Sequence, residues 1–195
     1  MNLITNRCLG AYIYRDILKE SYKNPFIWTG IPYTDFTTLF ESYSTLDFNN
    51  TRIGADDPKS LKGFYLVIDG KVKVEYSHVL FEWSANYPIQ RGNNIYYNKP
   101  WEYIADKYAE RLKRMIEPPV FMFMDIDFNR EYGIADIAKV NKTPLIVITC
   151  DSSYPENEFV KTLLVEHRDW RTVEWWKFIY GKYSNEISNL LISHG

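Results

Sequence analysis

The sequence predicts a mixed α/β fold, with a sheet that includes an antiparallel hairpin and is flanked by helices. Asp69-Gly70 separates two runs of strand-forming residues, which is typical of a β-hairpin because glycine tolerates a positive φ. Two short apolar runs, residues 120–126 and 145–149, have no polar face, as expected for strands covered on both sides. Other segments carry apolar side chains at the spacing of a helix face.

The composition is that of one globular domain spanning residues 1–195. Hydrophobic residues make up 46% of the chain, enough for a sizeable core, which excludes general disorder. The net charge of −2 gives no electrostatic basis for binding nucleic acid or an anionic membrane. Aromatic residues make up 17%, which we interpret as a large aromatic core rather than a surface that stacks on sugars or bases.

The cysteine content and the N-terminus indicate where the protein is found. Two cysteines do not form a disulfide framework, and the N-terminal residues lack the apolar segment of a signal peptide. The longest apolar run is far too short to span a bilayer. We therefore expect a cytoplasmic protein with reduced thiols that does not insert into a membrane.

The chain is predicted to begin with two helices. The first covers about residues 7–18, with Asn6 as its N-cap and an apolar stripe at helical spacing. Asn24-Pro25 then imposes an extended segment, because the residue before a proline avoids helical geometry. Tyr33 begins the second, shorter helix.

The hairpin follows a polar stretch, residues 49–63, which we interpret as a long surface loop. Its strands are predicted at residues 64–68 and 72–80. The second strand alternates apolar and polar side chains, and this period of two places His78 on the buried face.

The C-terminal half is predicted to alternate helices and strands. Pro100 fits the first turn of a helix, since its missing N–H would be unpaired there in any case. Two buried strands with a helix between them imply a right-handed crossover. The expected helices cover about residues 101–115, 134–140 and 172–191, and the expected strands cover residues 120–126 and 145–149.

Cys8 and His78 form the leading pair of candidate catalytic residues. Cys8 lies in the first turn of a predicted helix, where unpaired N–H groups and the helix dipole stabilise a thiolate, and Arg7 adds positive charge. A thiol nucleophile needs a base, which a histidine on a later strand can supply. This is the chain order of papain-like enzymes. The alternatives are a small buried apolar Cys8 and a hydrogen-bonded core His78.

Asp125 and Asp127 follow the first buried strand and support two different chemistries. Either carboxylate could orient the imidazole of a Cys-His pair. The same two residues form an Asp-x-Asp motif, which can hold Mg²⁺ or Mn²⁺ against a nucleotide-sugar diphosphate. No nucleotide-binding βαβ unit precedes this motif. The remaining alternative is that both residues cap a loop or the next helix.

Further polar residues are weaker candidates for a site. Arg111 and Arg114 share one predicted helix and could clamp a carboxylate or phosphate, or could simply pair with neighbouring glutamates on a solvated face. Cys150-Asp151 would share an edge with Asp125 if the two buried strands run parallel, although ordinary turn chemistry also explains them. The chain contains no GxGxxG, Walker, HExxH or CxxC motif, so we predict no cofactor and no metal site.

The order of these features resembles an uncharacterised bacterial family labelled exopolysaccharide biosynthesis proteins, which in turn resembles papain-like cysteine peptidases. The resemblance covers about residues 4–155 and does not include the last predicted helix. The similar segments are residues 4–10, 12–14, 24–26, 33–40, 77–78, 107–111 and 149–155.

The resemblance implies that Cys8 is the nucleophile and His78 the base, with Asn6 in the place of an oxyanion donor that binds substrate. The predicted function is thiol-dependent acyl transfer or hydrolysis of a small-molecule, glycan or acyl substrate in surface polysaccharide biosynthesis or modification. The alternatives are a metal-dependent glycosyltransferase that uses Asp125 and Asp127, and a non-catalytic binding or inhibitor protein that uses its tyrosine and tryptophan side chains.

Overall fold

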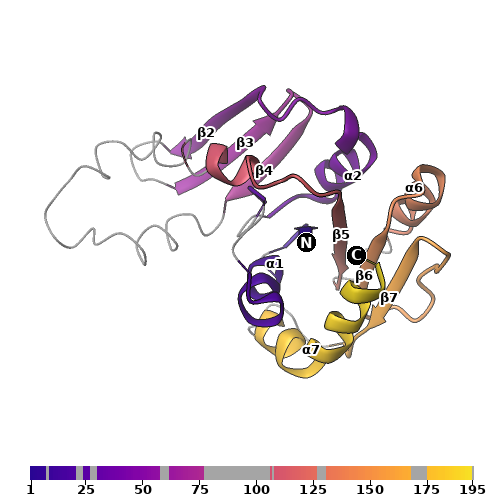
Figure 1. The fold of residues 1–195 in the computed structure, drawn as a ribbon. Helices are drawn as coiled ribbons and strands as arrows, with labels where there is room; N and C mark the ends of the chain where they lie inside the picture. The colour runs from indigo at the N-terminus through magenta and orange to yellow at the C-terminus, as the bar shows by residue number, and fades with distance from the viewer. Residues whose placement is uncertain are drawn as a thin grey trace, which may run out of the picture.

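The computed structural model describes residues 1–7, 9–20, 24–26, 30–57, 62–76, 106, 108–126, 131–167 and 175–194. These residues form a four-stranded parallel sheet, a three-stranded antiparallel sheet and several helices (Figure 1). The predicted α/β class is confirmed, and the hairpin belongs to a sheet of its own.

The parallel sheet forms the centre of the fold. Its strands lie in the order β1 (Asn2–Thr5), β5 (Pro119–Asp125), β6 (Leu145–Thr149) and β7 (Val160–Leu164), and every neighbouring pair is parallel. All five residues of β6 are buried, as the sequence predicted for a strand with no polar face. The helix α6 (Gly133–Asn141) joins β5 to β6 and confirms the strand-helix-strand order.

Helices cover both faces of this sheet. One face packs against α1 (Leu9–Tyr12), the π-helix η1 (Ile13–Leu18) and α7 (Trp175–His194), and α1 and α7 lie next to each other (Figure 1). The other face packs against α2 (Tyr33–Ser42) and α6. The predicted first, second, fourth and fifth helices are thus confirmed. Residues 108–112 are helical within the predicted 101–115.

Aromatic side chains fill the core between α2 and β5. The Phe36 and Phe40 rings of α2 meet the Phe121 ring edge-on, with centroids 6.0 Å and 4.7 Å away. Phe36 also contacts Phe123, with ring centroids 5.4 Å apart. All four side chains are buried, in accordance with an aromatic core.

The antiparallel sheet confirms the predicted hairpin. Its strands are β2 (Thr51–Asp57), β3 (Lys62–Ile68) and β4 (Val72–Tyr76), with Ile68 paired to Val72. Asp69 and Gly70 both have a positive φ, 51° and 68°, as a tight hairpin turn requires. Val72 and Val74 are buried and Lys73 and Glu75 are not, which confirms the alternation along this strand.

Several predictions about the fold need correction. The polar stretch 49–63 is not a long loop, because residues 51–57 pair with β3 as an edge strand. β1 and β7 were not predicted, since each is short and contains polar residues. Asn6 does not cap the first helix, because its side-chain amide bonds to the backbone of Met124.

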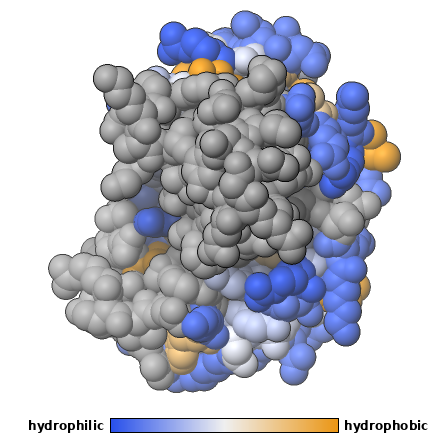
Figure 2. Space-filling model, turned by 90° about the vertical axis from the view of Figure 1, so that its left-hand side faces the viewer, coloured by the Kyte–Doolittle hydropathy of each residue, from blue (hydrophilic) through white to orange (hydrophobic). Residues whose placement is uncertain are grey.

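The surface of the described residues is mainly polar. Among the described residues visible in Figure 2, hydrophilic side chains predominate, and hydrophobic ones occur singly or in small groups. Isolated exposed apolar side chains are usual on globular proteins. Among the described helices, none is both long and apolar enough to cross a membrane.

Candidate functional site

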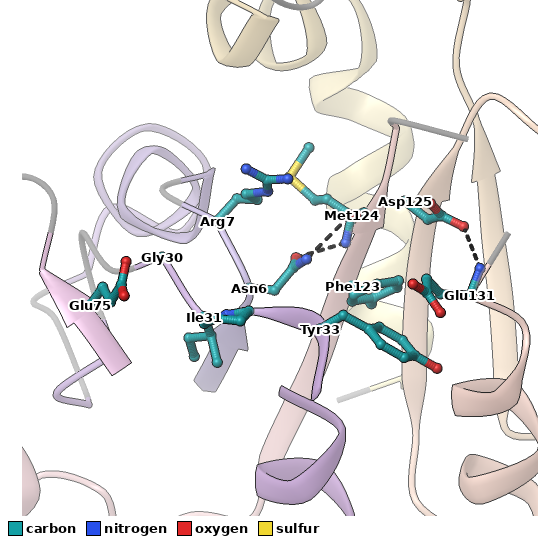
Figure 3. Close-up of a pocket in the computed structure, with 11 residues that line it drawn as sticks. Asn6, Arg7, Gly30, Ile31, Tyr33, Glu75, Phe123, Met124, Asp125 and Glu131 are labelled. Atoms are coloured by element: carbon teal, nitrogen blue, oxygen red, sulfur yellow. Dashed lines mark hydrogen bonds between the residues drawn. The ribbon is translucent and has the colours of Figure 1, made fainter. Parts of the chain in front are cut away.

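A pocket of about 250 Å³ lies at the carboxyl ends of β1 and β5 (Figure 3). Ligands of open α/β sheets bind at this edge, outside the carboxyl ends of the strands. The pocket is lined by Asn6, Arg7, Gly30, Ile31, Pro32, Tyr33, Glu75, Phe123, Met124, Asp125 and Glu131.

Asn6 forms the wall of the pocket where β1 ends. Its side-chain Nδ2 donates to the Met124 carbonyl at 3.2 Å, and its Oδ1 accepts from the Met124 N–H at 2.8 Å (Figure 3). The Asn6 carbonyl accepts the Ile31 N–H at 3.1 Å. One residue therefore ties together β1, β5 and the chain that leads into α2, which fixes this side of the pocket.

A backbone bridge brings the antiparallel sheet to the same pocket. The Gly30 N–H donates to the Glu75 carbonyl at 2.7 Å, and the Glu75 N–H donates to the Gly30 carbonyl at 2.9 Å. Asp35 on α2 also accepts the Lys73 N–H at 2.6 Å. The Glu75 carboxylate is paired with the Lys73 ammonium at 3.1 Å, so its charge is partly compensated.

Asp125 and Glu131 form the opposite wall. Asp125 is only 3% exposed, and its Oδ2 accepts the Glu131 N–H at 3.2 Å. The Tyr154 hydroxyl donates to the Glu131 carbonyl at 3.0 Å. A side chain at the end of β5 and a side chain that follows β6 therefore hold the N–H and the carbonyl of Glu131, and its carboxylate lies at the pocket (Figure 3).

Burial and nearby carboxylates both raise the pKa of the tyrosines beside this wall. Burial is the main cause that raises the pKa of the Tyr33 hydroxyl, and the carboxylates of Glu131 and Asp125 raise it further. Burial also raises the pKa of Tyr154, with Asp125 as the next contributor. Both phenols are therefore neutral hydrogen-bond donors at neutral pH.

The structure brings two of the predicted site residues, Asn6 and Asp125, to the pocket. Cys8, His78 and Asp127 lie outside the described residues. Residues close to two of them in the sequence are described: Arg7 directly precedes Cys8, and Glu75 lies three residues before His78. Arg7 and Glu75 both line the pocket.

The two predicted arginines do not line the pocket. Arg111 is buried, with 6% exposed, and Arg114 forms an ion pair with Glu110 one helical turn earlier. This ion pair agrees with the alternative interpretation, in which Arg114 pairs with a neighbouring glutamate on a solvated helix face. A clamp formed by both arginines on one ligand would need Arg111 at the surface, so the structure gives this part of the prediction no support.

Cys150 and Asp151 follow β6 at the carboxyl edge of the sheet, because Thr149 is the parallel partner of Asp125. Asp151 accepts the Tyr132 hydroxyl, and its Oδ1 also accepts the Ser153 N–H at 2.9 Å. The latter bond is ordinary turn chemistry. Cys150 Sγ lies 3.7 Å from the Glu166 carbonyl. Neither residue lines the pocket.

Sequence reasoning did not select Tyr33, Glu75 or Glu131 as site residues. Tyr33 was interpreted only as the start of a helix, and Glu75 only as the polar face of a strand. Glu131 stands outside any motif, and only its position after a buried strand could have indicated it.

The comparisons with known proteins add no family to these findings. No protein-family model matches the sequence, and no curated protein is significantly similar to it. Within the described ranges, no group of three or more histidine, cysteine, aspartate or glutamate side chains could hold a metal ion.

Proposed function

We propose that the chain catalyses thiol-dependent acyl transfer or hydrolysis at the pocket on the carboxyl edge of β1 and β5, with Cys8 as the nucleophile. One observation carries the proposal: Arg7, Glu75 and Asp125 line a common pocket. They come from the three chain segments that hold or adjoin the predicted nucleophile, base and orienting acid. Nothing in the local sequence requires these segments to meet.

The path of the chain from β1 to α1 also supports this role. Only residues 6–8 lie between the strand and the helix in the sequence, so Cys8 directly precedes α1. The guanidinium of Arg7 favours the thiolate over the thiol. The proposal includes a cytoplasmic location, where the thiol stays reduced.

In the proposed reaction the Cys8 thiolate attacks the carbonyl carbon of an acyl donor and forms a thioester. The imidazole of His78 holds the thiol proton and delivers it to the leaving group. Water or the hydroxyl or amine of a second substrate then gives its proton to His78 and attacks the thioester, the bond from carbon to sulfur breaks, and the thiolate–imidazolium pair is restored. The resemblance to exopolysaccharide biosynthesis proteins favours a substrate from surface polysaccharide.

The test is to detect the covalent intermediate. The protein is mixed with p-nitrophenyl esters of several chain lengths, and both p-nitrophenolate release and intact mass are followed. We expect a burst of release and one acyl group on the peptide that contains Cys8. Cys8→Ala should abolish both, and Cys150→Ala should change neither. Unchanged turnover in Cys8→Ala, or no acyl adduct from any ester, would overturn the proposal and favour a non-catalytic binding protein.

A second candidate is a metal-dependent glycosyltransferase in which Asp125 and Asp127 would hold the ion, because Asp125 lines the pocket. It predicts turnover of a nucleotide sugar that requires Mg²⁺ or Mn²⁺, is stopped by a chelator and survives in Cys8→Ala. The thiol mechanism predicts the opposite response to the chelator and to the substitution.

A further inference from the structure

The charges of the pocket are divided between its two sides. Arg7 lies where β1 ends, next in sequence to Cys8, whereas Asp125 is the last residue of β5 and Glu131 lies beyond it (Figure 3). Glu75 adds a third carboxylate, but this one is paired with Lys73. A ligand in the pocket therefore meets the cation of Arg7 where β1 ends and the carboxylates of Asp125 and Glu131 at the end of β5.

The backbone of Glu131 is fixed at the pocket by two hydrogen bonds. Its backbone N–H is held by Asp125 at 3.2 Å and its carbonyl by Tyr154 at 3.0 Å. In the described part of the chain, no cationic side chain forms an ion pair with the Glu131 carboxylate. A charged group whose backbone is fixed in this way loses little conformational freedom when it binds a ligand.

Two aromatic rings complete the negative side of the pocket. Tyr33 and Phe123 both line it, and their ring centroids lie 5.6 Å apart. Aromatic faces attract cations through their quadrupole, most strongly where water is partly excluded. Because Tyr33 is a neutral phenol, its hydroxyl can also donate a hydrogen bond to a ligand oxygen.

A carboxylate that lines a pocket together with aromatic rings is a combination that can recognise an ammonium group. We propose that this pocket binds a small molecule through a primary ammonium group and that Glu131 is the residue that selects it. The inference rests on the proposed function, since the ligand would be a substrate of the same site. The volume of about 250 Å³ suits a molecule of about the size of an amino sugar, or the end of a larger one.

The test measures binding in the Cys8→Ala protein, so that acylation does not contribute to the signal. Glucosamine, which is cationic at neutral pH, is compared with glucose and N-acetylglucosamine by calorimetric titration. We expect glucosamine to bind at least roughly tenfold more tightly than either neutral sugar, as expected for one charge-assisted hydrogen bond. Ethanolamine serves as a second amine and shows whether the sugar ring contributes to affinity.

Glu131→Gln keeps the shape of the side chain and removes its charge, so it should abolish the preference for glucosamine. Glu158→Gln, at an exposed carboxylate outside the pocket, is the matched control and should keep it. Equal binding of glucosamine and glucose, binding of neither amine, or a preference that persists in Glu131→Gln would each overturn the inference.

The two proposals fail separately. Ammonium-selective binding without an acyl adduct on Cys8 would overturn the thiol mechanism and leave the ligand class standing. An acyl adduct without ammonium selectivity would do the reverse. If Glu131→Gln does not fold, as judged by circular dichroism, the comparison of charged and neutral sugars in Cys8→Ala alone decides the inference.

Discussion

Asn6 and Met124 form a side-chain-to-backbone pair that extends the contact between β1 and β5 beyond Thr5, the last residue of β1. The Asn6 Oδ1 accepts the Met124 N–H at 2.8 Å, and its Nδ2 donates to the Met124 carbonyl at 3.2 Å. Both residues are buried. The side-chain amide of Asn6 thus takes the place of backbone hydrogen bonds just after the last residue of β1.

Asn6→Ala should therefore destabilise the protein by about 2–4 kcal/mol, because it leaves a buried N–H and a buried carbonyl of Met124 without partners. Urea unfolding followed by circular dichroism measures the change. Asn49→Ala, at an exposed turn position, is the control and should stay within about 0.5 kcal/mol of the starting protein. A similarly small effect of Asn6→Ala would show that the hydrogen bonds between Asn6 and Met124 contribute little to stability.

Substitution of Gly70 in the Asp69-Gly70 turn should lower the free energy of unfolding, whereas the same substitution at a control glycine in a helix should raise it. Gly70 has a φ of 68°, and a Cβ added there would meet no atom within 4 Å. Gly70→Ala should therefore cost about 1–2 kcal/mol from backbone conformation alone. Gly181 also has open space and no positive φ, and it lies in α7 two residues before the kink at Tyr183, so Gly181→Ala should stabilise by up to about 0.5 kcal/mol. Equal effects in thermal unfolding would contradict this account of the turn.

Tyr108 predicts a loss of stability at alkaline pH. Its hydroxyl donates to the Phe48 carbonyl at 2.8 Å, and burial raises its pKa from 10.0 to about 12. Between these values the unfolded chain loses the Tyr108 proton and the folded protein keeps it, so the free energy of unfolding falls as pH rises. The slope for one such group is up to about 1.4 kcal/mol per pH unit.

Urea unfolding at several pH values from about 9 to about 11 measures this slope. Tyr108→Phe removes the proton and should make the profile shallower, while it lowers stability at neutral pH by about 1 kcal/mol through the lost hydrogen bond. Buried tyrosines such as Tyr14 and Tyr154, whose pKa values are also raised, keep part of the slope in this variant. A variant profile parallel to that of the starting protein would contradict the assignment to Tyr108.

Elements with a strong local pattern could be predicted from the sequence. The apolar runs of β5 and β6 and the Asp69-Gly70 turn specify their structures with little help from the rest of the chain. β2 could not be predicted, because its residues include Arg52, Gly54 and Asp56, and its hydrogen bonds come from β3. Its strand geometry is imposed by the partner, and local composition argues against it.

The pocket could be predicted only in part, for the same reason. Asp125 could be predicted as a site residue because it ends a buried strand. Glu131 could not, because its backbone is held at the pocket by the side chains of Asp125 and Tyr154. Glu75 is held at the pocket by its bridge to Gly30 and by the hydrogen bond that the nearby Lys73 N–H donates to Asp35. Such contacts join residues far apart in the sequence, and no local spacing encodes them.

The last prediction concerns the relative reactivity of the two thiols. Cys8 directly follows Arg7, whose charge favours the reactive thiolate. Cys150 is half-buried, directly precedes the carboxylate residue Asp151, and has its Sγ 3.7 Å from the Glu166 carbonyl, all of which disfavour a thiolate. Iodoacetamide at near-neutral pH should therefore modify Cys8 at least roughly tenfold faster than Cys150, as measured by peptide mass spectrometry over time.

Substitution of the neighbouring arginine separates electrostatics from simple access. Arg7→Gln should slow the labelling of Cys8 and leave that of Cys150 unchanged, because only Cys8 loses a nearby positive charge. Arg52→Gln, at an exposed arginine of β2, is the control and should alter neither rate. If Cys8 reacts no faster than Cys150 in the native protein, and equally fast once the chain is unfolded in urea, then Cys8 is a packing residue and the thiol mechanism has no nucleophile.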